Sequence, residues 1–348
     1  MNYKYVVVGA GLAGLTIAER IANVLSEEVL IIEKKTHIGG ATYDFYDDAG
    51  ILIGKYGPHT FHTNDKEVFD YILQFTQWHD YTHHALSYVD GKFVPFPICR
   101  KTIKELYGTE LNEEDTAKFI SEHEDDLVDK FFRPFTFKQW GCQREELGQE
   151  VISRIPFRNT DEDRYFTDTY QGNPVGGYTK MFQNMISNPK IKVLLNTDYK
   201  EIISHLDYNL LIYTGPIDYY FDYSLGKLLF RSIDFIFETY KQESYQPVAS
   251  TRYPGLEEKY TRITEFKKMT GQKSDFTTIL KEIPCFGEEP YYPYPTPKWK
   301  QLAEQYRELC KKEEKTIFVG RLAEYRYYDM DDVVRRALDE FQKIKERK

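Results

Sequence analysis

The first forty residues order their apolar and polar positions as a strand, a helix and a second strand. A short run rich in β-branched residues, 3–8, predicts a buried strand. The alanine-rich apolar stretch 12–25 predicts a helix, and residues 28–32 predict a second strand. This order is typical of the first unit of a parallel sheet covered by helices.

Three glycines, Gly9, Gly11 and Gly14, join the first strand to the helix at the spacing G-x-G-x-x-G. Gly9 permits the tight turn, Gly11 lets a pyrophosphate approach the backbone, and Gly14 lets the helix pack close to the strand. The helix N-terminus offers free N–H groups, and Glu33, followed by Lys34, stands where a carboxylate binds ribose hydroxyls. The alternative is a glycine turn that binds nothing. Such a turn does not need a strand, a helix, a second strand and an acidic residue to follow one another in this order. We therefore predict a dinucleotide site that includes these five residues.

A second glycine pair, Gly39 and Gly40, follows in the run EKKTHIGG. A nicotinamide dehydrogenase has no need of another close backbone approach at this point, whereas a larger cofactor lying across the sheet edge does. The sequence therefore favours FAD over NAD, with both glycines in the cofactor site.

The hydrophobic pattern changes several times in the rest of the chain. Residues 82–97 alternate around Asp90-Gly91, which predicts an antiparallel hairpin outside the parallel sheet. Residues 101–140 are helical in pattern, and Pro134 should break or kink them. The other predicted elements are a helix at 174–186, strands at 192–195 and 210–214, an antiparallel sheet over 226–286, a strand at 316–319 and a terminal helix capped by Asp329 with Asp332.

Together these elements predict an α/β fold in which a discontinuous Rossmann-like FAD-binding domain carries a helical insertion and an antiparallel β-sheet domain. The 348 residues exceed the ~250–300 at which a single core stops growing. We expect residues 1–78, 171–225 and 301–348 in the FAD-binding domain. We expect 79–98 and 226–300 in the sheet domain, and 99–170 in a helical domain that includes a substrate lid.

Composition narrows the class of partner. A net charge of −9 argues against a general attraction to nucleic acid, so an anionic substrate needs locally placed arginines. The four cysteines show no C-x-x-C pairing, which is typical of reduced packing residues. The N-terminus enters a strand directly, and no run approaches the ~18 apolar residues of a membrane helix. We expect a cytoplasmic protein without a membrane span.

Two histidines, His59 and His62, lie in the glycine-containing segment ILIGKYGPHTFHTN. A metal site is the alternative reading, but no third ligand of matching spacing accompanies them. We expect no metal, and we assign both histidines to a loop beside the flavin ring.

Several stretches together resemble the UDP-galactopyranose mutase family. These are KYGPHTFHTN, KQWG, IPFR followed by YFTDTYQGNPVGGYTK, IYTGPIDYYFDY, KYTRITEF, EPYYP and GRLAEYRYYDM. The resemblance covers nearly the whole chain and keeps the order of the family's motifs. The family's three-part build matches the layout inferred above.

The resemblance implies a role for specific residues. Arg158 of IPFR and Arg262 of YTRI match the arginines that hold the substrate diphosphate, and we expect them and His62 to take part in catalysis. The positions that line the substrate pocket are matched by Trp140, Tyr170, Tyr291, Tyr292 and Tyr327. The positions that contact the cofactor are matched by Arg321, His59 and His62, with Asp329 and Met330 at the start of the last helix. The segment EFKKM departs from the family, where a histidine stands.

The resemblance also implies a reaction, the interconversion of UDP-galactopyranose and UDP-galactofuranose. N5 of reduced FAD attacks the anomeric carbon, UDP leaves, and the sugar ring opens and closes again; the furanose supplies cell-surface glycans. We expect a lid between Trp140 and Tyr170 and a homo-oligomer. A mutase that also accepts UDP-N-acetylgalactosamine, a flavin oxidoreductase of the amine-oxidase type and a non-catalytic UDP-sugar-binding protein are the alternatives.

Overall fold

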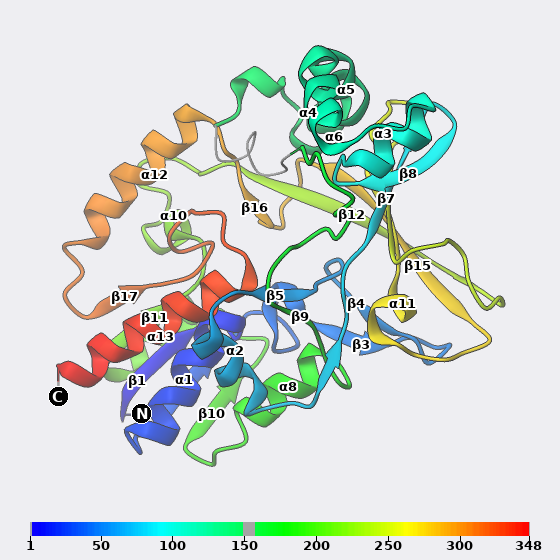
Figure 1. Cartoon of the computed structure of the whole chain (residues 1–348). Coiled ribbons are helices and arrows are strands. Elements are labelled where there is room, and N and C mark those ends of the chain that lie inside the picture. The colour runs from blue at the N-terminus through cyan, green and yellow to red at the C-terminus, as the bar shows by residue number, and fades with distance from the viewer. Residues whose placement is uncertain (1, 149–156, 348) are drawn as a thin grey trace.

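The computed structural model describes residues 2–148 and 157–347, and they form a parallel sheet with helices and a second, longer sheet (Figure 1). The helices of these residues are α1 (Leu12–Val24), α2 (Lys66–Leu73), α3 (Arg100–Tyr107), α4 (Glu113–Glu122), α5 (Glu124–Phe131), α6 (Arg133–Trp140), α8 (Tyr178–Met185), α9 (Tyr199–Ile202), α10 (Ile217–Tyr220), α11 (Phe266–Thr270), α12 (Pro297–Cys310) and α13 (Met330–Glu346). None of the helices in the described part of the chain has the length and apolar character of a membrane span.

The first sheet has five parallel strands in the order β10-β2-β1-β11-β17. Its strands are β1 (Asn2–Val8), β2 (Val29–Ile32), β10 (Ile191–Leu194), β11 (Asp207–Tyr213) and β17 (Thr316–Phe318). The order reverses at β1, whose neighbours are β2 on one side and β11 on the other. In open α/β sheets ligands bind beyond the carboxyl ends of the strands at such a point. The predicted Rossmann-like fold is confirmed.

Helices α1 and α13 pack side by side against this sheet, with α2 and α8 nearby. Their apolar faces join the inward side chains of the strands in the largest core, which includes Val7, Leu15, Ile31 and Phe182. These four side chains are fully buried. Burying each contributes roughly 1.5–3 kcal/mol, so packing against the sheet holds α1 in place and fixes the glycine turn before it.

The second sheet has seven strands in the order β16-β12-β15-β14-β13-β7-β8. Its strands are β7 (Ala85–Val89), β8 (Lys92–Phe96), β12 (Phe230–Tyr240), β13 (Ser250–Arg252), β14 (Arg262–Glu265), β15 (Thr277–Cys285) and β16 (Tyr292–Pro293). The hairpin around Asp90-Gly91 is confirmed as β7 and β8. The expectation of a purely antiparallel sheet is wrong at one pair, because β13 runs parallel to β7. The short helix α11 interrupts the predicted strand region.

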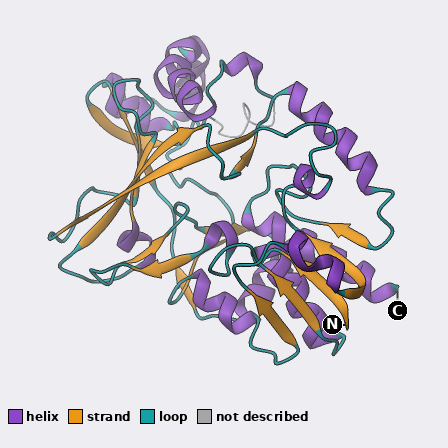
Figure 2. Cartoon of the chain, turned by 180° about the vertical axis from the view of Figure 1, so that it is seen from behind, coloured by secondary structure: helices purple, strands orange, loops and turns teal. Residues whose placement is uncertain are grey.

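Helices α3 to α5 cover the β7–β8 end of this sheet and α6 packs against β15, and the view from behind shows the two sheets as separate layers (Figures 1 and 2). The break predicted at Pro134 is confirmed, because α5 ends at Phe131 and α6 begins with Pro134 in its first turn. Proline is tolerated there, where its missing N–H would have no partner in the helix.

Two small sheets lie between the larger ones. One pairs β3 (Asp44–Tyr46) with β4 (Leu52–Gly54), and the other has the order β5-β9-β6, with β5 (Phe61–Thr63), β9 (Tyr170–Pro174) and β6 (Trp78–Asp80). The helix predicted over 174–186 therefore begins too early, since Pro174 ends a strand and α8 starts at Tyr178. Helix α12 was not predicted.

Candidate active site

The glycine turn has the geometry that its spacing predicts. Gly9 has a φ of +100°, which L side chains rarely adopt, and its N–H donates to Ile32 O at 2.9 Å. A Cβ on Gly14 would stand 2.1 Å from Gly9 O, so only glycine lets the helix lie this close to the turn. Gly11 precedes α1 without a side-chain cap, which leaves the first N–H groups of that helix facing outward for an anion.

The second glycine pair has a structural role beside any contact with a cofactor. A Cβ on Gly40 would stand 2.9 Å from the Cα of Gly11, and the Gly39 N–H donates to Ala10 O at 2.7 Å. The two glycine segments therefore contact each other through their backbones. The sequence interpretation attributed Gly39 and Gly40 to the cofactor alone and missed this contact.

Glu33 directly follows β2 and has a buried carboxylate whose two oxygens each accept one backbone N–H. Oε2 accepts from Ala10 at 2.7 Å, and Oε1 accepts from Lys35 at 2.7 Å. Each oxygen keeps acceptor capacity for a further donor, such as a ribose hydroxyl. Lys34 is exposed and directed elsewhere, since its Nζ forms an ion pair with Asp198 at 3.1 Å. The loop and Glu33 fit a dinucleotide, whereas the contacts of Lys34 do not place it in the turn.

The two predicted histidines differ in their surroundings. The Nδ1 of His59 donates to Gly57 O at 3.2 Å, and burial, together with the charges of Arg321 and Arg262, lowers the pKa of His59 to about 4. His62 is on β5, where its Nδ1 lies 3.0 Å from Asp168 Oδ2 and its ring stacks on Phe166. Across residues 2–148 and 157–347 no group of three or more His, Cys, Asp or Glu side chains is placed to hold a metal ion.

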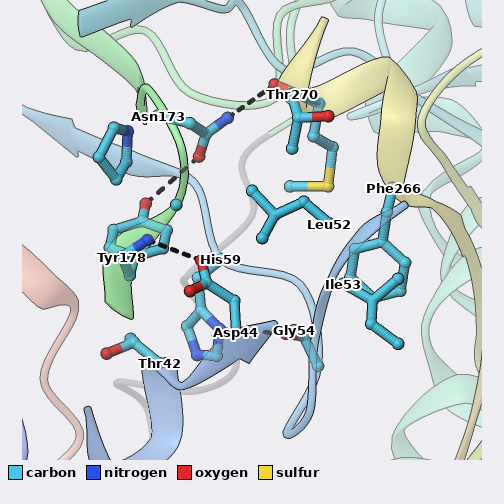
Figure 3. A pocket seen from close by; sticks show the side chains of 14 residues that line it. Thr42, Asp44, Leu52, Ile53, Gly54, His59, Asn173, Tyr178, Phe266 and Thr270 are labelled. Carbon is cyan, nitrogen blue, oxygen red and sulfur yellow. Dashed lines mark hydrogen bonds between the residues drawn. The ribbon is translucent and has the colours of Figure 1, made fainter. Parts of the chain in front are cut away.

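A small, partly open cavity borders His59 (Figure 3). Its volume is about 40 Å³, a few times the ~10–15 Å³ that one water needs on the same measure, so it is too small for a cofactor ring. Its polar wall is already bonded: Asp44 accepts the Tyr178 N–H at 2.6 Å, and Asn173 donates to Met269 O at 3.0 Å. We assign this cavity to packing rather than binding.

Arg262 begins β14 and is paired with Glu282 on β15. The guanidinium donates two hydrogen bonds to the carboxylate, from Nε to Oε2 and from Nη2 to Oε1 at 2.9 Å. Burial opposes the charge of Arg262, but Glu282 outweighs it and raises the pKa of the arginine. Glu282 also lies against the histidine loop, because a Cβ on Gly57 would stand 3.2 Å from its Oε1. Arg262 thus meets the loop that carries His59.

The side chain of Arg158 is held by backbone carbonyls. Its guanidinium donates to Glu162 O at 3.1 Å, to Arg164 O at 2.5 Å and to Tyr165 O at 3.4 Å. Part of the predicted lid, residues 149–156, lies outside the described residues. Tyr165 links the two predicted arginines, since it carries the carbonyl bonded to Arg158 and acts electrostatically on Arg262.

An aromatic cluster brings three of the predicted substrate residues together with Arg321, a predicted cofactor residue. Trp140, at the end of α6, lies edge-to-face with Tyr292 at 6.3 Å between ring centroids. Tyr292 stacks on Tyr327 at 5.7 Å, and the guanidinium of Arg321 lies 5.4 Å from the Tyr292 ring. Burial raises the pKa of Tyr292 to about 12, and the charge of Arg262 also acts on it. These contacts place Tyr292 beside the arginines.

Two other predicted residues lie apart from that cluster. Tyr291 is adjacent to Tyr292 but faces Tyr56 and Phe235, at 6.0 and 5.6 Å between ring centroids. Tyr170, on β9, stacks on Phe69 of α2 at 4.5 Å. The structure therefore distinguishes Tyr292 from Tyr291, which the sequence left open.

The N-terminus of α13 borders the same region, beside β5. The Asp329 N–H donates to Asp332 Oδ2 at 3.1 Å, as the spacing predicts, and Met330 begins the helix. The next residue, Asp331, has a pKa that burial raises, and Thr63 and His62 act on it. The positive end of this helix therefore lies against β5 and its histidine.

Three further residues in the region were missed from sequence. Glu282 was not singled out, although the strand pattern KEIP places it in the predicted sheet. His83 is buried beside Tyr81, whose OH lies 2.9 Å from its Nδ1, and burial together with the charge of Arg262 lowers its pKa to about 3. Arg252, which no motif in the sequence singled out, is also buried. A predicted strand register would have been needed to find all three.

Comparison with known proteins identifies the family. The sequence model for UDP-galactopyranose mutase matches residues 130–327, and that for the NAD(P)-binding Rossmann-like domain matches residues 7–75. A Klebsiella pneumoniae protein named "Probable UDP-galactopyranose mutase" is 33% identical over 98% of this chain and 95% of its own length. The chain belongs to the UDP-galactopyranose mutase family. It is therefore an isomerase, as the motifs predicted.

Members of this family carry different names. An Escherichia coli protein named dTDP-fucopyranose mutase is 32% identical, over 97% of both chains. A crystal structure of reduced UDP-galactopyranose mutase superposes with a TM-score of 0.77 at 17% identity, covering 99% of this chain and 96% of the other. At that identity the superposition shows the shared fold.

Proposed function

We propose that this enzyme interconverts UDP-galactopyranose and UDP-galactofuranose, with FAD as its cofactor. The observation that carries the proposal is the position of Arg262, which lies where the histidine loop, the Tyr292 cluster and Arg321 meet. A diphosphate held by Arg262 would place the attached sugar toward His59 and the cofactor. The K. pneumoniae relative supports the choice of substrate.

The dinucleotide loop, Glu33 and the N-terminus of α13 together fit FAD. We infer that Gly9, Gly11 and Glu33 would hold the adenosine and pyrophosphate, and that His59 and the N-terminus of α13 would border the ring. When bound and reduced, FAD supplies the nucleophile, its N5 atom, that displaces UDP from the anomeric carbon. The chain then needs no nucleophile of its own.

The residues of the chain bind and orient. Arg262 and Arg158 offer N–H donors to the diphosphate, whose charge grows as it leaves, and such preorganised donors stabilise developing charge. His59, with its pKa near 4, is neutral at pH 7 and adds no positive charge beside the ring. Trp140, Tyr292 and Tyr327 cover the region with aromatic faces and exclude water.

A second candidate substrate is dTDP-fucopyranose, because the E. coli mutase of that name is almost as similar as the K. pneumoniae protein. UDP-N-acetylgalactosamine remains a further alternative. An amine oxidase would share the fold, as the putrescine oxidase structures with TM-scores of 0.53 to 0.55 indicate, but it has no need of an arginine that holds a diphosphate. A non-catalytic binder would bind UDP without turnover.

The test is to incubate the dithionite-reduced, FAD-loaded protein separately with UDP-galactofuranose, dTDP-fucopyranose and UDP-N-acetylgalactosamine. The products are then separated by chromatography. We expect UDP-galactopyranose from the first, and none from the air-oxidised protein. Absence of any ring isomerisation would contradict the proposal. We further infer that the enzyme acts in the cytoplasm as a homo-oligomer and supplies galactofuranose to cell-surface glycans.

A further inference from the structure

A row of charged side chains crosses three neighbouring strands of the seven-stranded sheet. Arg252 on β13 is directly opposite Arg262 on β14, and Arg262 is directly opposite Glu282 on β15. Residues directly opposite in a sheet point to the same face, with Cβ atoms about 5 Å apart. Two arginines therefore stand next to each other on the face that carries the proposed diphosphate residue.

The row contains two positive charges and one negative charge. Glu282 is committed to Arg262 by two hydrogen bonds. Arg252 is 4% exposed, and its guanidinium has no ion pair and no hydrogen bond with any residue in 2–148 and 157–347. Its Nη1 is buried without a partner among the same residues. Like charges directly opposite destabilise a sheet, and an unpaired buried charge costs more than an exposed one.

Two aromatic rings pack against this guanidinium. Its central carbon lies 3.7 Å from the ring centroid of Phe96 on β8 and 4.0 Å from that of Phe135 on α6. Cation–π contact stabilises the charge in part, but it does not satisfy the N–H groups. Burial, opposed by Tyr165 and aided by the charge of Arg262, lowers the pKa of Arg252 to about 10, so it stays charged at pH 7.

A second buried arginine shows how this chain satisfies a structural guanidinium. Arg231 is equally buried and also lies over a ring, that of Phe286 at 4.3 Å. It donates to the carbonyls of Gln139 at 2.7 Å, Lys138 at 2.9 Å and Pro284 at 3.3 Å. Arg252 has the same packing without these acceptors. The acceptor it lacks is therefore one that residues 2–148 and 157–347 do not supply.

We propose that Arg252 is a substrate-binding residue whose Nη1 donates to an anionic oxygen of the nucleotide diphosphate, beside Arg262. This inference rests on the proposed function. The positive charge of Arg262 is balanced by Glu282, so Arg252 supplies the uncompensated charge that an anion requires. Because β14 separates Arg252 from Glu282 and the histidine loop, the residue would contact the part of the diphosphate nearer the nucleoside.

The pyrimidine carbonyls are the other oxygen acceptors on the same ligand, and the experiment separates the two. Binding of UDP, uridine and inorganic pyrophosphate to the oxidised, FAD-loaded protein is measured by calorimetry for wild type, Arg252→Met and Arg252→Lys. Hydrogen bonds to charged groups predict a loss of about 10- to 100-fold in UDP and pyrophosphate affinity for Arg252→Met. Uridine affinity should be unchanged. Arg252→Lys keeps the charge but not the planar edge and should recover part of the affinity.

Thermal unfolding without ligand gives an independent readout. Removing an unpaired charge should leave Arg252→Met as stable as wild type or more stable, with a smaller rise in Tm on adding UDP. The matched control, Arg231→Met, should be less stable than wild type, because three backbone carbonyls lose their hydrogen-bond donor. A purely structural Arg252 would instead give a lower Tm and an unchanged UDP-induced rise.

Three results would overturn the assignment. These are an unchanged UDP affinity in Arg252→Met, an equal loss of affinity for uridine and UDP in that variant, and a pyrophosphate affinity that is the same in Arg252→Met and wild type. If the wild-type protein binds pyrophosphate but not UDP, and Arg252→Met loses pyrophosphate binding, the proposed substrate is wrong but the anion site at Arg252 stands. If Arg252→Met does not fold, the lysine variant carries the same comparison between UDP and uridine.

Discussion

Replacing Arg262 by methionine tests the proposed site and its structural support together. The change removes a diphosphate donor, and loss of one preorganised donor to developing charge typically lowers turnover by about 10²–10³-fold. It also leaves Glu282, whose side chain is 3% exposed, without its partner. Breaking a buried ion pair costs about 3–5 kcal/mol, and the lower end applies because the Arg262 side chain is 32% exposed.

The structural part of this effect can be removed by a second substitution. At ~2.1 cal/mol/K per residue, a loss of about 3 kcal/mol lowers the Tm of 348 residues by about 4 °C. The double variant Arg262→Met/Glu282→Met removes the stranded carboxylate and should regain most of that Tm, because an apolar pair often replaces a buried ion pair without loss. Its turnover should remain low.

The assay is steady-state kinetics on dithionite-reduced, FAD-loaded variants, with Tm measured by circular dichroism. Near-normal turnover in Arg262→Met would refute the assignment of Arg262 to the diphosphate. A double variant that regains turnover along with Tm would show that Arg262 acts only by neutralising Glu282.

Four other outcomes are expected. Gly14→Ala should yield protein that does not retain FAD, because its Cβ would stand 2.1 Å from Gly9 O, and retention of flavin absorbance would contradict this. Glu33→Gln should weaken FAD binding about tenfold, as measured by fluorescence titration, since one charge-assisted acceptor is lost. Arg158→Ala should reduce turnover by at least about 10² with FAD still bound, and Arg158→Lys should restore little of it; normal kinetics in the alanine variant would show a purely structural arginine. In the unfolded chain a histidine has a pKa of about 6.5, whereas burial lowers the pKa of His83 in the folded protein to about 3. Stability should therefore fall as the pH falls from about 6.5 toward 3, and less steeply in His83→Phe by denaturant titration.

Local signals in the sequence predicted those parts of the fold that depend on interactions between residues close together in the chain. The spacing of Gly9, Gly11 and Gly14 defines the turn because each glycine acts on its immediate neighbours. The pairing of β13 with β7 was not predictable in this way, since the two strands are about 160 residues apart and either direction satisfies the same alternation. Helix α12 did carry a signal, a proline in its first turn and an amphipathic repeat, that the sequence interpretation did not use.

The site was predictable in its composition but not in its pairings. Arg262 and Trp140 were identified through motifs that resemble the family's. Glu282 and Arg252 gain their meaning from the strand register, because a shift of one residue would turn either side chain to the other face. Tyr291 and Tyr292 illustrate the same point, since neighbouring residues of an extended segment face opposite ways.

The parallel sheet has a consequence for the order in which the protein can assemble during synthesis. Its central strand β1 pairs with β11, about 200 residues later, and β11 pairs with β17, which begins at Thr316. A ribosome that has released only the first half of the chain has made the glycine turn but not one flank of the strand that carries it. Contacts of such long sequence separation form slowly and late. We therefore expect nascent chains to hold their dinucleotide loop open until translation nears its end, so that flavin joins a finished polypeptide and any C-terminal truncation before β17 yields colourless protein.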